Sequence, residues 1–433
     1  MPENLLKSSW RDLDPTELMI VLHERMGGTW QGNLSARRPS ELYIPMFGPT
    51  CRVMLRFRGP KITAIERGPF FDRTQWDQIS NEIENSVLKG PRRVGREYSF
   101  SGRRVTGSWR GNVSGVQILP PPNDLPSVPT ESGDHPFILE FPLRNTSIDR
   151  LTNHRRIRRH RDLTLLLNIL LAGGAKSMGR STHCWAGTEW VQQWFSPTLN
   201  PYLSDALSAP AADQLEEVAP EEYENLLGND GMGLRVPSDL DQSICLYEAL
   251  SGSNREKFDR AMFWFSTSSR LWDVSMSASF AALAFAVESM TSGGNVEDVL
   301  CPVCGSPTES GPTKFFRNFL AAYAPGNSLD TDRNDMYSLR SKVVHGDHLV
   351  ELDWAIPIVG PWTPPGFKER DQYGALWKLT RTALRNWLKN RNHYLQQARE
   401  VCAYFHWIER GRPLWQATVD WEWAEQAFPA TDC

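Results

Sequence analysis

An arginine and a histidine lie five residues apart in YSLRSKVVHG, the segment from Tyr337 to Gly346. Histidine titrates near neutral pH, so His345 could take or give a proton. Arginine keeps its charge and presents a planar fork of N–H groups, so Arg340 could hold a phosphate. These two functions suit metal-free cleavage of RNA, in which the 2′-hydroxyl group attacks the phosphate. The products would carry a 2′,3′-cyclic phosphate and a 5′-hydroxyl, and DNA would stay intact.

The spacing of this pair limits how the two side chains could meet. Along a straight helix, five residues rotate the side chain by about 140°, so Arg340 and His345 would not share a face. Either the helix ends at His345 and Gly346 and turns the imidazole back, or two protomers place their motifs opposite each other. A structural alternative also exists, because a histidine at a helix C-terminus interacts favourably with the dipole and the last carbonyl groups.

The residues around the pair resemble a known family. The pattern Y-x-x-R-S-x-x-V-H-G resembles the R-x4-6-H signature of the HEPN ribonucleases, and the serine after the arginine resembles their Apea-like branch. AFAVESM, from Ala284 to Met290, resembles the helix that these domains carry upstream of the motif. A basic amphipathic helix from Trp377 to Arg391 follows at a similar distance. The resemblance covers Thr146 to about Trp407.

This resemblance implies an all-α HEPN-like bundle with Arg340 and His345 as the catalytic pair, in a composite groove of a homodimer. Glu288 resembles the helix acid near HEPN sites, and it could equally be the ion-pair partner of a buried arginine. Tyr337 and Ser341 are candidate phosphate or orientation partners, or they make local helix hydrogen bonds. Relatives of this branch act in bacterial anti-phage defence as abortive-infection toxins that cut host or phage RNA, with transfer RNA among the candidate substrates. The alternative is a HEPN module that binds nucleotides or RNA and dimerises without cleavage.

Basic residues gather in two places that could contact the RNA backbone. The segment RLTNHRRIRRH, from Arg150 to His160, is the densest, and the helix after the motif places lysines and arginines near one face. The candidate RNA-binding residues are Arg155, Arg158, Arg159, Lys342, Lys378, Arg381 and Arg385. A solvated basic helix face is the structural alternative.

The segment CPVCG contains Cys301 and Cys304 and resembles half of a zinc knuckle. A tetrahedral site needs two more ligands, for which His183 and Cys184 are the nearest candidates and Cys245 is another. The alternative is a plain turn with two free thiols. Catalysis by the arginine–histidine pair would need no cofactor, so any zinc here would be structural.

From about Trp30 to Phe141 the pattern favours strands. CRVMLRFRG, KITAIERG, REYSFSG and HPFILEFPL are short alternating or apolar runs bounded by turn residues, and a helix with an Asp72 cap is predicted from Arg73 to Lys89. GTWQGNLS is echoed by GSWRGNVS, which suggests equivalent strand openings at Trp30 and Trp109. We expect a small all-β domain, a sandwich or barrel, over residues 1–145. It could sense a phage trigger or select targets, although both tryptophans could simply anchor the core.

After Arg144 the pattern becomes helical, and the overall expectation is an α+β chain whose residues 146–433 form an all-α bundle. RIRRHRDLTLLLNILLAGG predicts a helix that ends at Gly173 and Gly174. Residues 208–240 are acidic and contain prolines, so we expect an exposed insertion there.

Composition places few limits on function. The 433 residues carry a formal net charge of −4, so no overall basic charge indicates nucleic-acid binding. The N-terminal segment has no secretory signal pattern, and apolar runs are too short to span a membrane. Seven irregularly spaced cysteines favour a reducing compartment over a disulfide framework. We therefore expect a cytoplasmic protein without membrane partners.

Overall fold

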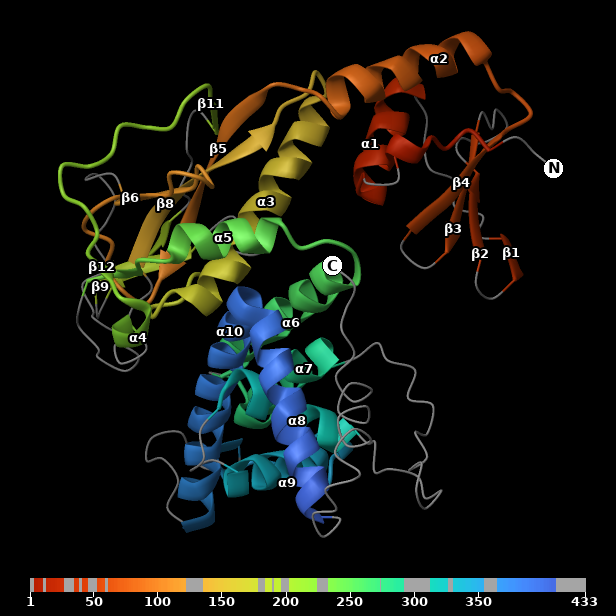
Figure 1. Ribbon diagram of the computed structural model, residues 1–433. Coiled ribbons are helices and arrows are strands. Elements are labelled where there is room, and N and C mark those ends of the chain that lie inside the picture. Colours follow the sequence, from red (N-terminus) through yellow and green to blue (C-terminus); the bar gives the residue numbers. More distant parts are fainter. Residues whose placement is uncertain are drawn as a thin grey trace.

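The computed structural model combines helices and sheets in one chain (Figure 1). It describes residues 4–10, 13–26, 35–38, 41–45, 53–58, 61–121, 135–177, 184–188, 191–195, 202–223, 233–272, 274–291, 312–325, 330–353 and 364–409. The mixed α+β class expected from the sequence is confirmed. Within the described residues, no helix has both the length and the apolar character needed to cross a bilayer.

The N-terminal part pairs a helix with a four-stranded sheet. After a 3-10 turn at Ser8–Trp10, α1 spans Pro15–Met26. The antiparallel sheet follows the order β1-β2-β3-β4, with bounds Ser35–Arg38, Glu41–Pro45, Val53–Arg58 and Lys61–Arg67. In β3 the side chains alternate between buried and half-exposed, as the period of two predicts.

A second helical segment completes this part of the core. α2 spans Arg73–Glu82 and continues as a π-helical turn, Ile83–Val87. Asp72 caps α2 by accepting a hydrogen bond from the Gln75 N–H at 3.1 Å, as predicted. Trp10, Leu22, Leu55 and other apolar residues form a cluster from positions 5–88 that also includes Ile148 and Leu151, here called the N-terminal cluster.

A five-stranded sheet follows, with strand order β11-β5-β8-β7-β6. Its central pair is β5, Arg92–Ser101, and β8, His135–Arg144, joined in antiparallel register from Arg92↔Arg144 to Ser101↔His135. The outer strands are β6 (Trp109–Arg110), β7 (Gln117–Leu119) and β11 (Leu203–Ser204). The four strand predictions, now β3, β4, β5 and β8, are therefore confirmed.

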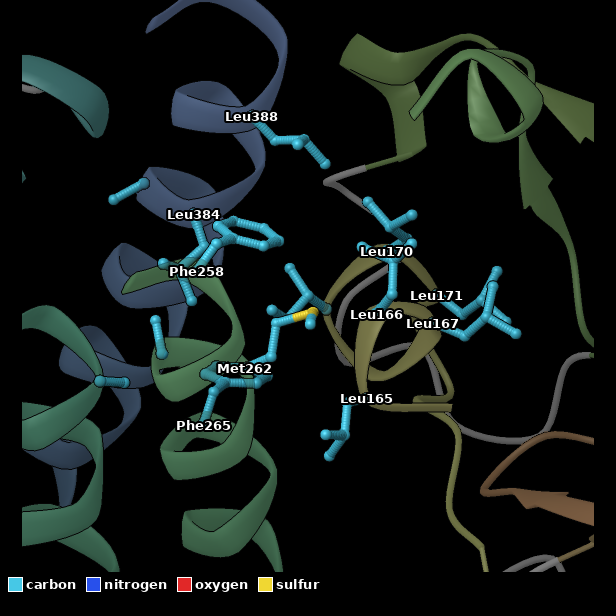
Figure 2. Packing of buried hydrophobic residues seen from close by; sticks show 14 of the residues in the cluster. Leu165, Leu166, Leu167, Leu170, Leu171, Phe258, Met262, Phe265, Leu384 and Leu388 are labelled. Carbon is cyan, nitrogen blue, oxygen red and sulfur yellow. The ribbon is translucent and has the colours of Figure 1, made fainter. Parts of the chain in front are cut away.

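Helix α3, Asp149–Leu170, connects the two parts of the molecule. Its first turn adds Leu151 to the N-terminal cluster, whereas its leucines from Leu163 onward pack between the five-stranded sheet and the helices of the C-terminal part. Figure 2 shows Leu165, Leu166 and Leu170 near Phe258 and Met262 of α6. The helix ends at Leu170 with an extended cap residue at Leu171, so the predicted end near Gly173 and Gly174 is confirmed, but neither glycine caps the helix.

The C-terminal part is a set of packed helices. They are α6 (Gly252–Leu271), α7 (Met276–Thr291), α8 (Pro312–Tyr323), α9 (Asp330–His345) and α10 (Pro364–Glu409), with a 3-10 turn at Glu351–Asp353 before α10. Their buried residues join those of the five-stranded sheet and α3 in one large cluster, here called the main cluster.

The segment between the sheet and this bundle, expected to contain an exposed acidic insertion at residues 208–240, is exposed at most described positions from 209 to 222 but is anchored by buried apolar residues. It holds β12 (Glu217–Val218), α4 (Pro220–Tyr223), β13 (Val236–Pro237) and α5 (Leu240–Glu248), after a separate hairpin of β9 (Cys184–Thr188) and β10 (Val191–Phe195). Leu215, Tyr223 and Val236 are buried. The Tyr223 hydroxyl donates to the Arg235 carbonyl oxygen at 2.9 Å and accepts from the Ala172 N–H at 2.8 Å. Apolar residues between the acidic ones therefore anchor the segment.

The expectation of an all-β sandwich or barrel over residues 1–145 is corrected in two ways. α1 adds a helix that the strand pattern did not predict. The two sheets do not face each other across one core, because the first belongs to the N-terminal cluster and the second to the main cluster. A domain boundary at residue 145 stays a prediction, but the buried clusters do not follow it.

Candidate active site at the end of helix α9

The motif predicted from the sequence lies on the last two turns of α9, and the helix ends at His345. Gly346 follows with φ 78°, a conformation that glycine adopts without strain. The Gly346 N–H donates to the Val343 carbonyl oxygen at 3.2 Å, and the Asp347 N–H donates to that of Lys342 at 2.9 Å. This pair of bonds is the Schellman helix end, so α9 ends where the first of the two sequence alternatives placed its end.

Arg340 is fixed by Glu288 of α7. Its Nη2 atom donates a hydrogen bond to Oε2 at 2.8 Å and lies 2.6 Å from Oε1 of the same carboxylate. The two side chains are 14% and 23% exposed, so solvent screens this ion pair only in part. The Nε atom of Arg340 is buried and has no hydrogen-bond acceptor among the described residues. The contact with Glu288 therefore occupies one corner of the guanidinium group.

Tyr337 holds the other side of Arg340. The guanidinium carbon lies 5.6 Å from the centre of the Tyr337 ring, within reach of a cation–π contact. That ring packs edge-on against Phe316 of α8 at 5.5 Å. Tyr337 is thus an orientation partner of Arg340, while Ser341 is half-buried on the same helix.

His345 lies apart from Arg340 within one protomer. Its side chain is exposed, and no hydrogen bond or ion pair joins it to Arg340 among the described residues. Because α9 continues through His345, the two side chains keep the offset of about 140° that a straight helix gives. The possibility that the helix end turns the imidazole back toward Arg340 is therefore not realised.

The segment after His345 is tied to the start of α7. Asp353 accepts hydrogen bonds from the Ser275 hydroxyl and from the N–H groups of Met276 and Ser277 at 2.7–2.9 Å. Burial opposes the ionised form of Asp353, but these hydrogen bonds outweigh it and lower the pKa of the carboxyl. The Ser277 hydroxyl in turn accepts from the Val350 N–H at 2.8 Å. This network fixes the loop that follows the motif.

A histidine–carboxylate pair beside the motif was missed by sequence reasoning. His348 Nε2 lies 2.7 Å from Oε1 of Glu369 in the first turns of α10, and Glu369 Oε2 accepts from the Glu351 N–H at 2.8 Å. The adjacent Asp347 and His348 were visible in the sequence. Glu369 lies 21 residues further on, and no local spacing connects it to them.

The three arginines expected to bind RNA on α3 are held by carboxylates. Arg155 donates to Glu17 of α1 at 2.7 Å, with both side chains mostly buried. Arg158 pairs with Asp14 and Arg159 with Glu248. These pairs connect α3 to α1 and α5, which favours the structural interpretation of this basic segment.

Two arginines predicted to bind RNA on α10 lie inside the protein, and for them the prediction is wrong. Arg381 is fully buried, and its Nε and Nη2 atoms donate to the carbonyl oxygens of Ile169 and Leu170 at the end of α3, at 2.7 and 3.2 Å. Burial lowers the pKa of Arg381 to about 10, so it stays charged at neutral pH. Arg385 is 3% exposed beside the Tyr223 ring. The pattern of basic residues along α10 therefore could not show which arginines are exposed to solvent and which, like Arg381, are buried against the end of another helix.

The remaining predicted RNA contacts are available to solvent, because Lys342 on α9 and Lys378 on α10 are both exposed. The structure supports the interpretation of Trp109 as a core residue. Trp109 is 5% exposed in the main cluster, and its indole N–H donates to Glu217 at 3.1 Å. It is a core anchor, while Trp30 lies outside the described residues.

The zinc site stays a prediction. Cys301, Cys304 and His183 lie outside the described residues, and Cys184 lies in β9 without a described side chain. Cys245 is half-buried in α5 with a free thiol, and burial raises its pKa. The described residues hold no cluster of three metal-binding side chains.

Comparison with known proteins adds no relative to this picture: no family model, curated protein or solved structure matches the chain.

Proposed function

We propose that this chain is a metal-independent endoribonuclease in which Arg340 binds the scissile phosphate and His345 transfers protons. The observation that carries the proposal is that the last turns of α9 hold both a firmly held guanidinium and an exposed imidazole, at a helix end capped by glycine. A HEPN-like role for the helical bundle is consistent with the motif's place on α9 and with Glu288 on the preceding long helix. Ser341 and Lys342 would add contacts to the same phosphate.

The proposed reaction uses the RNA's own nucleophile. His345 accepts the proton of the 2′-hydroxyl group, the 2′-oxygen bonds to phosphorus, and the bond from phosphorus to the 5′-oxygen breaks. The leaving oxygen takes a proton from the imidazolium group or from water. Arg340 offsets the charge that develops on the phosphate oxygens, and the prior fixing of its guanidinium lowers the cost of ordering it during the reaction.

We further propose that the working site forms between two protomers, because the two side chains point in different directions within one chain. Exposed apolar residues lie beside the motif and could form part of the contact: Leu349 is 46% exposed and Phe367 is 52% exposed. Both flank the His348–Glu369 hydrogen bond, which fixes the loop against α10. A second copy of the chain could cover them while it brings its His345 toward Arg340.

Mixing of two inactive variants tests this arrangement. In a mixed dimer of Arg340→Ala and His345→Ala chains, one composite site would keep both an arginine and a histidine. We expect each variant alone to be inactive and each mixed dimer to regain up to about half of the activity of a wild-type dimer, because one of two sites is restored. An equal mixture that exchanges subunits freely should therefore regain about a quarter of wild-type activity, because about half of its dimers are mixed. A mixture that exchanges subunits and stays inactive would place the pair within one chain.

The N-terminal part is proposed as a sensor or target-selecting unit in an abortive-infection system that acts on cytoplasmic RNA. α1 and the four-stranded sheet have their own core and lie at the far end of the molecule from α9 (Figure 1). A part that is remote from the proposed site can regulate or recruit, but it cannot supply catalytic groups.

A second candidate is a module that binds RNA or nucleotides and dimerises without cutting. The ion pair between Glu288 and Arg340 favours it, because a carboxylate already neutralises the cation that would bind the phosphate. The two candidates differ in one outcome, whether the bond between phosphorus and the 5′-oxygen is broken.

Incubation of total RNA with the purified full chain in EDTA tests the proposal. Wild type should produce fragments that end in 2′,3′-cyclic phosphate, and His345→Ala should not. His23→Ala, a histidine substitution on distant α1, is the matched control and should cut normally. Intact RNA with wild type, under conditions where the same preparation arrests growth in cells, would favour the binding module.

A further inference from the structure

A groove of about 510 Å³ lies where α6, α10 and the segment after α3 meet. Its lining combines aromatic and cationic side chains from segments far apart in the sequence: Lys176, Trp272, Arg370, Tyr373, Trp377 and Lys378. No carboxylate is among the described residues that line it. Arg370 and Lys378 in this lining differ from the arginines of α3, which are neutralised by acidic partners.

The aromatic part of the groove is a supported platform. Trp272 follows α6 and is 39% exposed, and its ring centre lies 4.4 Å from that of Tyr373. Tyr373 is buried, with its hydroxyl 2.9 Å from the Ser279 hydroxyl. Trp377 packs one turn further along α10, with its ring 5.7 Å from Phe265 of the main cluster. An exposed indole on such support can receive a flat ring with little loss of its own freedom.

The cationic part lies along one stripe of α10. Arg370, Gly374 and Lys378 follow each other at intervals of four residues, so the two exposed cations lie about 12 Å apart on the same side. Neither makes an ion pair with another described residue. At Gly374, no heavy atom other than its chain neighbours and the adjacent backbone of α10 lies within 4 Å of the position that a Cβ atom would take, so this side of the helix is open to a ligand.

The groove begins on α10 next to the residue that contacts the loop after the motif. Arg370 directly follows Glu369, whose carboxylate contacts His348 at 2.7 Å, three residues after His345. Lys176 lies at the other side, where its backbone N–H and carbonyl oxygen both bond to Phe100 of β5 at 2.7 and 2.8 Å. A chain bound beside α9 could therefore extend along α10 toward the five-stranded sheet.

We propose that this groove binds single-stranded RNA, with a base stacked on Trp272 and backbone phosphates at Arg370 and Lys378. The choice of RNA as ligand rests on the proposed function, whereas the single-stranded form follows from the groove itself. Stacking requires an unpaired base, and exposed cations that make no ion pair with another described residue attract phosphates. A duplex keeps its bases inside the stack and could not use the indole.

Binding is tested with the full chain carrying His345→Ala, so that the probe is not cut, and a short fluorescein-labelled single-stranded RNA. In this background Trp272→Ala should weaken binding about tenfold, the loss typical of one base–aromatic stack. Trp272→Phe should restore most of the affinity. Phe263→Ala is the matched control, because Phe263 is a 44% exposed aromatic residue of α6 outside the groove.

The phosphate contacts have their own measurement. Removal of both cations by Arg370→Ala with Lys378→Ala should reduce the slope of log Kd against log salt by about 1.4, since each phosphate contact on a single strand contributes about 0.7. Lys61→Ala, an exposed lysine of β4, should leave the slope unchanged.

The inference would be overturned if Trp272→Ala bound single-stranded RNA as tightly as its parent and the double variant kept the same salt slope. It would also be overturned if Trp272→Ala weakened binding of duplex RNA equally, or if the groove bound an acidic peptide more tightly than RNA. The outcome is separable from that of the proposed function. Wild type that binds RNA through Trp272 but leaves it intact would refute only the cleavage proposal. Wild type that cuts RNA while the groove variants bind normally would refute only the groove.

Discussion

Acidification should weaken the packing of α3 on the five-stranded sheet through one buried histidine, His160. Its ring stacks on Phe141 with 13° between the planes, and its Nε2 atom lies 2.8 Å from the Ser99 hydroxyl. Burial, and secondarily the charge of Arg156, lowers the pKa of His160 from 6.5 to about 4. The folded protein therefore holds this imidazole neutral at pH 7.

The direction and size of the change in unfolding free energy follow from the difference in the pKa of His160 between the folded and unfolded chain. In the unfolded chain His160 binds a proton at its ordinary pKa of 6.5, whereas in the folded chain it stays neutral until about pH 4. Its contribution to the unfolding free energy is therefore complete above pH 6.5 and declines as the pH falls from 6.5 to 4. The full difference corresponds to about 3 kcal/mol, and about 2 kcal/mol of it is lost by pH 5.

Urea unfolding of wild type and His160→Gln, followed by far-ultraviolet circular dichroism at pH 7.5 and pH 5, measures this loss. Glutamine can keep the hydrogen bond to Ser99 but does not titrate, so wild type should lose about 2 kcal/mol more than the variant between the two pH values. Other acidic and basic groups titrate in both proteins and cancel in the comparison. An equal loss in both proteins would refute the assignment of a buried, neutral His160.

Two further substitutions probe the proposed site. Glu288→Gln removes the counter-charge of the mostly buried Arg340 and should lower the unfolding free energy by about 2 kcal/mol. A double-mutant cycle with Arg340→Gln should give a coupling free energy of about 1 kcal/mol or more. Additive effects of the two substitutions would mean that the ion pair contributes little. Gly346→Ala places a side chain at φ 78° and should cost about 1 kcal/mol in thermal unfolding. Gly374→Ala, inside α10 with open space around the site, should instead stabilise by about 0.5 kcal/mol, and the same sign for both would contradict the helix-end account.

Local sequence patterns predicted the elements that have local causes. The alternation in β3, the Asp72 cap and the glycine that ends α9 each depend on residues within one element or its flanks. The contact of Arg340 with Glu288, left open in the sequence between a catalytic and a structural role, needed the packing of α9 on α7.

Features that depend on distant partners were not predictable in this way. A run of arginines on α3 was expected to face solvent, but acids of α1 and α5 neutralise it. Arg381 looked like a member of a basic face, and only the position of the end of α3 shows why it is buried. The groove at Trp272 combines residues from positions 176 to 378, so no spacing along the chain could indicate it.

The central claim is that the RNA's own 2′-hydroxyl group attacks the phosphate, activated by His345 and stabilised by Arg340. Its most direct test uses an RNA whose cleavage site has been mapped with wild-type protein, and a matched RNA with a single 2′-deoxynucleotide immediately 5′ of that bond, both in EDTA. The account predicts that the all-ribose RNA is cut at this bond and that the substituted RNA resists cleavage there. Cutting of the substituted bond at the same rate would contradict it, because the nucleophile would then come from elsewhere.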